Sequence, residues 1–322
     1  MKPVLILCSC TDPGAPEDEA DTWRTAQEMG NALSRAYAVE YANGDEERIF
    51  DRLLALKQAD GIAVNMMERP EDVRWPAILE KIGLPYTGCD AFTCMLSTHK
   101  PWMKLFADQA GMRSSKGITL SDGGTETLEL KFPVIIKPAA EDASVGIRQR
   151  NLCSTEAEAR ARLTELRAEH RGPWLIEEYI PGTDLALPFF ARNGKARVLP
   201  ALEVRYDKSP PGVLPILSYE AKWEKGHPAY TGHTEICPAQ LPKDAADEIT
   251  AGAERLAALL RLSGYARVDF RLDEDRRPWF LELNANPRVS ETDCYFVRAA
   301  KATGMTYFDI LSELIETACR RN

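Results

Sequence analysis

The sequence predicts an α/β (α+β) protein, with a parallel sheet near its N-terminus and antiparallel hairpins farther along. First, short apolar runs alternate with stretches of helical spacing over residues 1–82, which is typical of parallel strands joined by helices. Second, Asn193-Gly194 separates two apolar runs, and this dipeptide is a strong hairpin signal. Third, residues 264–286 contain two alternating strands around a polar turn.

The composition narrows the functional class. The chain has 322 residues, 44% of them hydrophobic and 28% charged, which is ordinary for a soluble globular protein of two or three domains. The net charge of −9 argues against a nucleic-acid partner, whose phosphates attract a basic surface. The eight cysteines form no C-x-x-C pair and histidines number only four, so no zinc cluster is expected. No apolar run approaches the ~20 residues of a membrane span, and we expect a cytoplasmic protein without a membrane partner.

Three domains are expected. The first, residues 1–96, has expected strands at 3–8, 39–41 and 61–65 and expected helices at 21–37, 46–57 and 75–82. The second, residues 97–184, opens with a helix over 97–109 and continues with a strand at 132–137, a helix over 154–172 and a strand at 174–180. The third, residues 185–322, begins with strands at 185–191 and 196–202. It continues with an irregular stretch over 222–238, long enough for a lid, and helices over 243–262 and 307–320.

The two strands of residues 264–286 carry a candidate metal site. In the first strand the polar face holds Arg267, Asp269 and Arg271. In the second, Trp279, Leu281 and Leu283 are assigned to the apolar face, and Glu282 and Asn284 to the polar one. Pairing as a hairpin brings Asp269, Glu282 and Asn284 together beside Arg267. Such oxygen ligands suit Mg²⁺, and an arginine beside them can hold a phosphoryl group or an oxyanion. The alternative is an ordinary hairpin with a solvated polar face.

Two upstream segments carry groups that suit a nucleotide. Residues 137–146, KPAAEDASVG, follow a buried strand, and their small side chains let backbone N–H groups approach a phosphate, beside Lys137 and the hydroxyl of Ser144. In residues 174–184, strand-end carboxylates can accept ribose hydroxyls, while the backbone of Glu178 and Ile180 can face an adenine edge. The alternatives are a surface turn and a charged edge strand.

Five segments occur in a fixed order along the chain, namely FPVIIKPAAEDASVGI, LIEEYIPGTD, YEAKW, EICPAQLP and YARVDF…FLELNANP. Their order and spacing carry a resemblance to ATP-grasp ligases, and specifically to the D-alanine–D-alanine ligase family. It extends upstream through IGLPYTGCDAFTCMLSTHKPWMKLFADQAGM and covers roughly residues 75–315. It implies a three-domain ATP-grasp fold with ATP held between two sheets, and, because relatives are often dimers, it allows a homodimer.

The resemblance also implies roles for individual residues. Nucleotide-contacting lysines match Lys100 and Lys137, and the acids at the ribose match Glu177 and Asp184, although the family usually has Glu at the latter position. A mobile-loop serine matches Ser144, and a phosphate-contacting lysine matches Lys222. The magnesium ligands, for which Mn²⁺ is an alternative ion, match Asp269, Glu282 and Asn284. Arg267 matches the arginine that steadies the acyl phosphate and tetrahedral states.

The sequence departs from the family on the side of the second substrate. Arg288 replaces a glycine, Asp293 falls where a serine is usual, and Trp223 replaces a tyrosine, so these three are candidate substrate-binding residues. Ala143 replaces the first serine of the loop pair. The N-terminal G-G-x-S-x-E-x-x-V-S run is missing, and Asp18 and Glu19 are the candidates for its glutamate.

We therefore expect an ATP-dependent carboxylate–amine ligase that forms an acyl phosphate, releases ADP and phosphate, and joins small amino-acid-like substrates in a specialised pathway. Because a new charge in a closed pocket alters specificity, we expect it not to make D-alanyl-D-alanine efficiently. One alternative is the D-alanine–D-alanine ligase of cell-wall synthesis. Another is an inactive nucleotide-binding protein, against which the retained Arg267, Asp269, Glu282 and Asn284 argue. Both substrates stay open, as does the choice among amine, hydroxyl and thiol nucleophiles.

Overall fold

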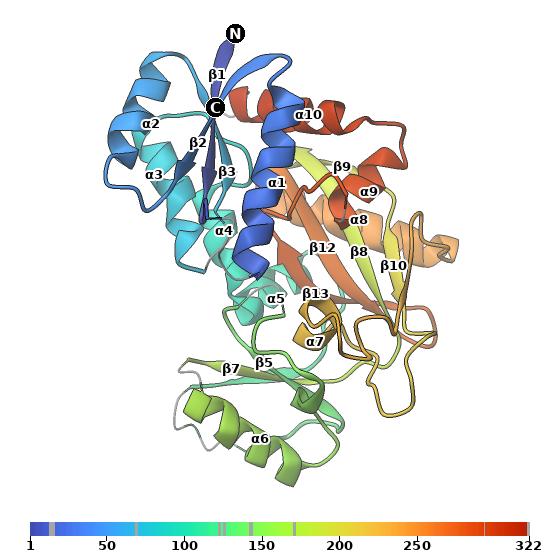
Figure 1. Ribbon diagram of the computed structural model, residues 1–322. Helices are drawn as coiled ribbons and strands as arrows, with labels where there is room; N and C mark the ends of the chain where they lie inside the picture. Colours follow the sequence, from blue (N-terminus) through green and yellow to red (C-terminus); the bar gives the residue numbers. More distant parts are fainter. Residues whose placement is uncertain are drawn as a thin grey trace.

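The structure is a computed structural model that describes residues 1–12, 17–67, 70–121, 124, 127–141, 144–169, 172–292 and 294–320. The described part contains one parallel sheet of three strands and two antiparallel sheets, each flanked by helices (Figure 1). The predicted α/β class with an N-terminal parallel sheet is confirmed. The predicted domain boundaries after residues 96 and 184 stay predictions.

The parallel sheet has the order β2-β1-β3, formed by β2 (Tyr37–Asn43), β1 (Lys2–Cys8) and β3 (Ile62–Met66). Alternate side chains of β1 enter two different cores. Val4 and Ile6 pack with α1 (Glu17–Leu33) and α10 (Tyr307–Cys319), whereas Leu5 and Leu7 pack with α2 (Ile49–Gln58) and α3 (Arg74–Ile82). Because both faces are covered, the strand reads as a continuous apolar run.

The central sheet is antiparallel, with the order β4-β7-β5-β6. Its strands are β4 (Gly117–Leu120), β7 (Trp174–Glu178), β5 (Val134–Pro138) and β6 (Leu152–Cys153), and α6 (Glu156–Glu169) covers one face. The helix predicted over 97–109 is in fact the end of α4 (Ala91–Thr98) and the whole of α5 (Lys100–Gln109). The break falls at His99, two residues before Pro101 in the first turn of α5, where a proline favours the start of a helix.

The C-terminal sheet has the order β11-β10-β8-β12-β13, and β9 also pairs with β8. Its strands are β8 (Thr183–Arg192), β9 (Lys195–Val198), β10 (Leu202–Arg205), β11 (Thr234–Ile236), β12 (Gly264–Leu272) and β13 (Pro278–Asn284). The strand predicted over 196–202 is divided into β9 and β10, and Pro200, which lacks an N–H to donate, lies between them. α5 and α8 (Lys243–Leu259) pack on the apolar face of this sheet.

Two short helices complete the C-terminal part. α7 (Tyr219–Trp223) ends where the predicted irregular stretch begins, and α9 (Tyr295–Lys301) follows β13. The last helix, α10, returns to the N-terminal sheet and lies beside α1 (Figure 1). The two ends of the chain are therefore packed in one core. None of the described helices has the length and apolarity that a membrane crossing requires.

Candidate active site

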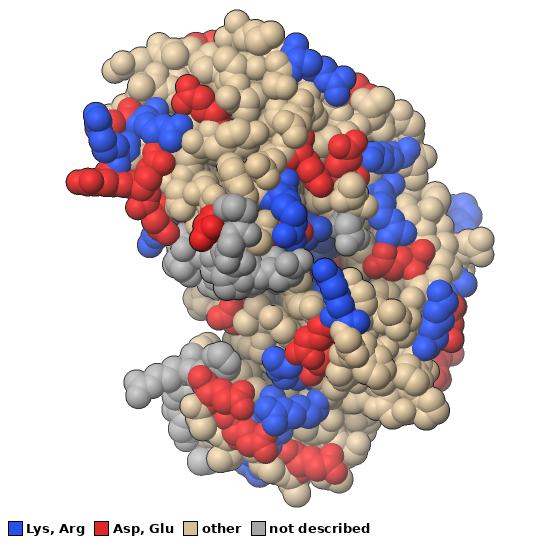
Figure 2. Space-filling view, in the orientation of Figure 1, with Lys and Arg blue, Asp and Glu red and all other residues tan. Residues whose placement is uncertain are grey.

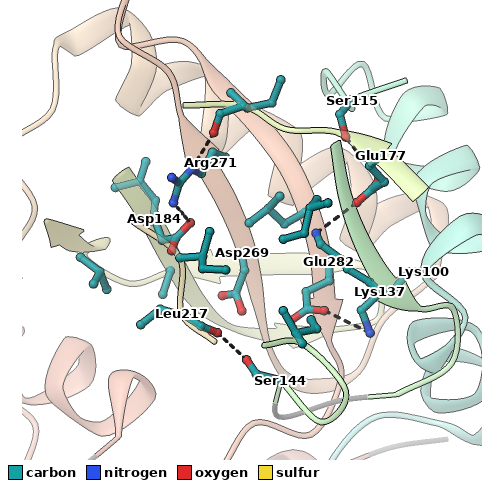
Figure 3. A pocket seen from close by; sticks show the side chains of 18 of the residues that line it. Lys100, Ser115, Lys137, Ser144, Glu177, Asp184, Leu217, Asp269, Arg271 and Glu282 are labelled. Carbon is teal, nitrogen blue, oxygen red and sulfur yellow. Dashed lines mark hydrogen bonds and ion pairs between the residues drawn. The ribbon is translucent and has the colours of Figure 1, made fainter. Parts of the chain in front are cut away.

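The candidate site is a pocket between the central and the C-terminal sheets. Its walls come from β5 and β7 on one side and from β8, β12 and β13 on the other (Figure 3). In the space-filling view a notch separates the lobe that carries α6 from the rest of the molecule (Figure 2). Lys and Arg side chains lie beside this notch. Most of the predicted site residues line the pocket, namely Lys100, Lys137, Ser144, Glu177, Glu178, Ile180, Asp184, Lys222, Arg267, Asp269 and Glu282.

Strand register brings the acid pair together. Asp269 and Glu282 are direct partners in the antiparallel pair of β12 and β13, so their side chains share one face. Asn284 is the partner of Arg267. It is not among the residues that line the pocket, and its Oδ1 accepts the backbone N–H of Asn286 at 3.2 Å.

Part of the predicted strand pattern is wrong because a β-bulge lies beside Asp269. Because the register shifts after Asp269, Phe270 faces Phe280 instead of Leu281. Phe280 enters the core with no exposed surface, whereas Leu281 lines the pocket. The assignment of Trp279 and Leu281 to the core face was therefore wrong, since Trp279 is half-buried and donates its ring N–H to Asp273. The bulge turns two consecutive side chains, Leu281 and Glu282, toward the pocket.

Arg267 is held by Asp269 in a two-bond fork. Its Nε donates to Oδ1 at 2.6 Å and one terminal nitrogen donates to Oδ2 at 2.7 Å. Burial would lower the pKa of Arg267, but the Asp269 carboxylate outweighs it and raises that pKa, so the guanidinium stays charged. The ring of Tyr295, which sequence reasoning missed, lies 5.6 Å from this guanidinium and lines the pocket.

The oxygen ligands present fit a hard divalent cation. Glu282 and Asp269 keep 28% and 19% of their side-chain surface exposed inside the pocket, which leaves room for an ion and its waters. Burial opposes ionisation of Glu282, yet Lys100, Lys222 and Lys137 together lower its pKa. Among the described residues no group of three His, Cys, Asp or Glu side chains is arranged around one point. Two carboxylates with water and phosphate oxygens are the arrangement that Mg²⁺ accepts.

Three lysines approach the acid pair from different elements. Lys100 Nζ, at the start of α5, lies 3.6 Å from a Glu282 oxygen and donates to the carbonyl of Glu141. Lys137, on β5, binds Glu177 at 3.1 Å. Lys222, on α7, has its pKa lowered by burial, although the charge of Glu282 opposes this shift. A concentration of positive charge at one end of the pocket suits phosphoryl oxygens.

Glu177 forms ion pairs with two lysines of the chain. It is 1% exposed and binds Lys104 and Lys137 in ion pairs, and it accepts the hydroxyl of Ser115 at 3.2 Å. Burial raises the pKa of a carboxyl, but the two lysines outweigh it and lower the pKa of Glu177 to about 2. These contacts differ from the ribose contact that the resemblance implies. Sequence reasoning missed Lys104, although its four-residue spacing from Lys100 places both on one face of α5.

The loop after β5 is closed onto the segment before α7. Ser144 has a left-handed backbone, with φ of 63°, and its hydroxyl donates to the carbonyl of Leu217 at 2.7 Å (Figure 3). Arg148 binds Glu224 at 3.0 Å, and Gln149 donates to the carbonyl of Leu214. The loop and the lysine-bearing helix α7 are thus tied together. Ala143, singled out from the sequence, lies outside the described residues.

On the side of the second substrate, the structure gives an arrangement that the sequence did not suggest. Arg288 forms an ion pair with Asp21 on α1 and is absent from the pocket lining. Trp223 ends α7 and does not line the pocket either. Asp293 and the side chains of Asp18 and Glu19 lie outside the described residues. The ion pair therefore ties the segment after β13 to α1, and this contact depends on long-range packing.

Comparison with known proteins gives the family. The family model described as the C-terminus of D-ala D-ala ligase matches residues 109–316. The chain belongs to the D-alanine–D-alanine ligase family. The D-alanine–D-alanine ligase of Bordetella pertussis is 33% identical over 256 residues, which cover 78% of this chain and 75% of that protein. The enzyme of the same name from Desulfotalea psychrophila is 31% identical over 257 residues, covering 78% and 76%.

A solved structure supports the same family at the level of the fold. The D-alanine–D-alanine ligase of Bacillus anthracis complexed with ATP superposes with a TM-score of 0.78 at 20% identity, covering 99% of this chain and 98% of that one. The predicted ATP-grasp fold and the predicted carbon–nitrogen ligase are confirmed. The comparisons favour the alternative, a D-alanine–D-alanine ligase, over our leading hypothesis of changed substrates. The roles of single site residues, a homodimer and a cytoplasmic location stay predictions.

We predict that Glu177→Gln lowers the free energy of unfolding at pH 7 by about 3–5 kcal/mol, because two buried lysines lose their counter-charge. The pKa of Glu177 is lowered in the folded protein. Its stabilising contribution is therefore complete above the unfolded pKa of about 4.3 and is lost as pH falls toward the folded value. Urea unfolding between pH 7 and pH 3 checks this, and the gap between wild type and variant should narrow toward acid.

The matched control for this variant is Glu178→Gln, which alters the neighbouring, half-buried carboxylate. It should change the unfolding free energy by no more than about 0.5 kcal/mol. A gap for Glu177→Gln that stays constant from pH 7 to pH 3 would contradict the assigned charge pairing.

Proposed function

We propose that the protein is an ATP- and magnesium-dependent ligase that joins two small amino acids, with D-alanine as the first candidate for both. The observation that carries the proposal is the meeting of the acid pair Asp269 and Glu282 with Arg267 and Lys100 in one pocket between two sheets. The names of the relatives support D-alanine as substrate. The Bacillus anthracis enzyme was solved in complex with ATP, which supports ATP as the nucleotide.

In the first step an oxygen of the substrate carboxylate attacks the γ-phosphorus of ATP. The bond from that phosphorus to the β–γ bridging oxygen breaks, ADP leaves, and an acyl phosphate forms. Lys100, Lys137 and Lys222 offset the charge on the phosphoryl oxygens, and their positions on three elements allow them to surround one group. Asp269 and Glu282 would hold Mg²⁺, which when bound neutralises phosphate charge and orients the transferring group.

In the second step the amine of the second amino acid attacks the acyl carbon. The carbonyl oxygen gains negative charge, the phosphate leaves with the electron pair of its bond, and the nitrogen loses a proton. Arg267 is suited to the developing oxyanion because Asp269 fixes both its charge and its orientation. Removing one such donor typically costs about 3–4 kcal/mol of transition-state stabilisation.

A second candidate function is a ligase of the same mechanism with a changed second substrate. The observation that favours it is Arg288, which stands where the family has a glycine and is paired with Asp21 on α1. A charged arginine in place of a glycine, tied to α1 outside the pocket lining, would change how this side of the molecule is held. The two candidates differ only in the amine that they accept.

The first prediction of this proposal tests the reaction itself. With ATP, Mg²⁺ and D-alanine we expect D-alanyl-D-alanine, ADP and phosphate, at a kcat/KM of about 10⁴ M⁻¹s⁻¹ or more if D-alanine is the substrate on both sides. Mass spectrometry of products and chromatography of nucleotides check this. Products that contain AMP would contradict the acyl-phosphate mechanism. ADP release with D-alanine that depends on another amino acid, amine or amide would favour the second candidate.

The second prediction concerns the metal. Glu282→Gln should lower turnover by about 100-fold or more and raise the Mg²⁺ concentration for half-maximal rate, because glutamine keeps the shape but removes a charge from the ion's site. The matched control is Glu274→Gln, an exposed glutamate in the turn of the same hairpin. Near-normal turnover of Glu282→Gln at ordinary Mg²⁺ would show that this residue is not a ligand.

The third prediction concerns the brace to α1. Because Arg288 is paired with Asp21 and is absent from the pocket lining, we expect Arg288→Met to lower kcat/KM about fivefold for all amine substrates alike, which corresponds to ~1 kcal/mol for a half-buried ion pair. Asp21→Asn should give the same loss. Arg24→Met is the control, since Arg24 also binds Asp21 but is half-exposed. A loss confined to amines with a free carboxylate would instead make Arg288 a substrate ligand.

A further inference from the structure

Arg271 lies on the same face of β12 as Arg267 and Asp269, at the end of the pocket away from Glu282 (Figure 3). The sequence places it on the polar face, and none of the steps above uses it. It is only 3% exposed. A buried guanidinium is costly unless its charge and its N–H groups are satisfied. Its partners therefore indicate what it does.

Four hydrogen bonds surround this guanidinium. Nε donates to the carbonyl of Ile180 at 2.9 Å, and one terminal nitrogen donates to Asp184 Oδ1 at 2.8 Å. The other terminal nitrogen donates to the hydroxyl of Tyr179 at 2.7 Å and to the carbonyl of Pro215 at 2.6 Å. The rings of Tyr179 and Tyr206 lie 5.3 and 5.4 Å from it, within reach of a cation–π contact.

These partners come from three different parts of the chain. Tyr179 and Ile180 belong to the connection from β7 to β8, which joins the central sheet to the C-terminal sheet. Asp184 is on β8, and Pro215 is in the loop before α7, the helix that carries Lys222. One side chain on β12 thus fixes the position of the inter-sheet connection relative to the loop that leads to the phosphate end.

Asp184 keeps acceptor capacity after these contacts. Its Oδ1 accepts from Arg271 and its Oδ2 accepts the hydroxyl of Tyr206. A carboxylate offers about four lone-pair positions, so each oxygen can accept one further hydrogen bond. The two donors fix the plane of the carboxylate beside the pocket, which Asp184 lines. Vicinal hydroxyls, such as those of a ribose, are the donors that such a fixed carboxylate fits.

We propose that Arg271 is a positioning residue for the nucleoside end of the site, which holds Asp184 in the orientation that accepts the ribose hydroxyls. The inference rests on the proposed use of ATP. It assigns Arg271 no contact with the reacting atoms. Without the guanidinium, Asp184 loses its ion-pair partner, and the connection through Ile180 loses its anchor.

The hydroxyl groups of the nucleotide provide the readout. A general structural role for Arg271 would weaken every nucleotide equally, whereas a role through Asp184 weakens only nucleotides that carry ribose hydroxyls. Calorimetric titration of the full chain with ATP and with 2′,3′-dideoxy-ATP, both with Mg²⁺ and without amino acid, separates the two roles. Wild type should prefer ATP by roughly tenfold or more, as hydrogen bonds to a charged group allow.

In Arg271→Met we expect the affinity for ATP to fall by roughly tenfold or more and the affinity for the dideoxy nucleotide by less than about threefold, so that the preference is lost. The matched control is Arg277→Met, an arginine of the same hairpin whose side chain is 55% exposed, which should keep the wild-type preference. Tyr206→Phe removes only the second donor to Asp184. It should reduce the preference in the same direction, and it decides the matter if thermal unfolding shows that Arg271→Met is not folded.

Equal losses for both nucleotides in folded Arg271→Met, or an unchanged preference in both variants, would overturn the inference. A wild-type protein that binds the two nucleotides equally would do the same. A wild-type protein that binds neither nucleotide would instead refute the proposed use of ATP. The two failures are therefore distinguishable in one set of titrations.

Discussion

Buried positive charges in the gap between the two antiparallel sheets require carboxylate partners, and the site is arranged around that requirement. Glu177 binds Lys104 and Lys137, Asp269 binds Arg267, and Asp184 binds Arg271. In each pair at least one member is on a central strand of a sheet, so the backbone ladder fixes where the charge lies. Breaking one such pair leaves an uncompensated charge away from water, which is much costlier than losing a surface ion pair. Lys137 and Arg267 therefore line the pocket with their charges already paired.

The pocket has two chemically distinct ends. At one end Lys100 approaches the acid pair and Lys222 has its pKa lowered by burial, so charge there is concentrated and sensitive to an incoming anion. At the other end Arg271 makes four hydrogen bonds and lies within cation–π distance of two tyrosine rings. The first end is suited to changing charge during phosphoryl transfer, and the second to rigid recognition of a neutral group. The bulge after Asp269 belongs to this division, because it turns Glu282 and Leu281 together toward the pocket.

The residues on the side of the second substrate are held by different contacts from those on the nucleotide side. Their described contacts join distant parts of the chain, as in the ion pair of Arg288 with Asp21 and the hydrogen bond from Ser290 to Glu28. The names of the relatives favour D-alanine as the second substrate. In the segment after β13, however, Arg288 and Asp293 differ from the residues that are usual in the family. Specificity depends on differences between competing amines, so the two candidate functions are best separated by products.

The sequence by itself determined the parallel N-terminal sheet, the hairpin at Asn193-Gly194 and the convergence of Asp269 with Glu282. Each of these follows from local signals, namely periodicity and turn chemistry, that act over a few residues. Motif order also identified the ATP-grasp resemblance. The sequence alone could not determine the bulge that moves Leu281 out of the core, the pairing of Glu177 with Lys104, or the four hydrogen bonds of Arg271. Those features depend on which strands and helices meet in three dimensions. A contact between residues as far apart in the chain as Asp21 and Arg288 produces no periodic pattern in the sequence from which it could be predicted.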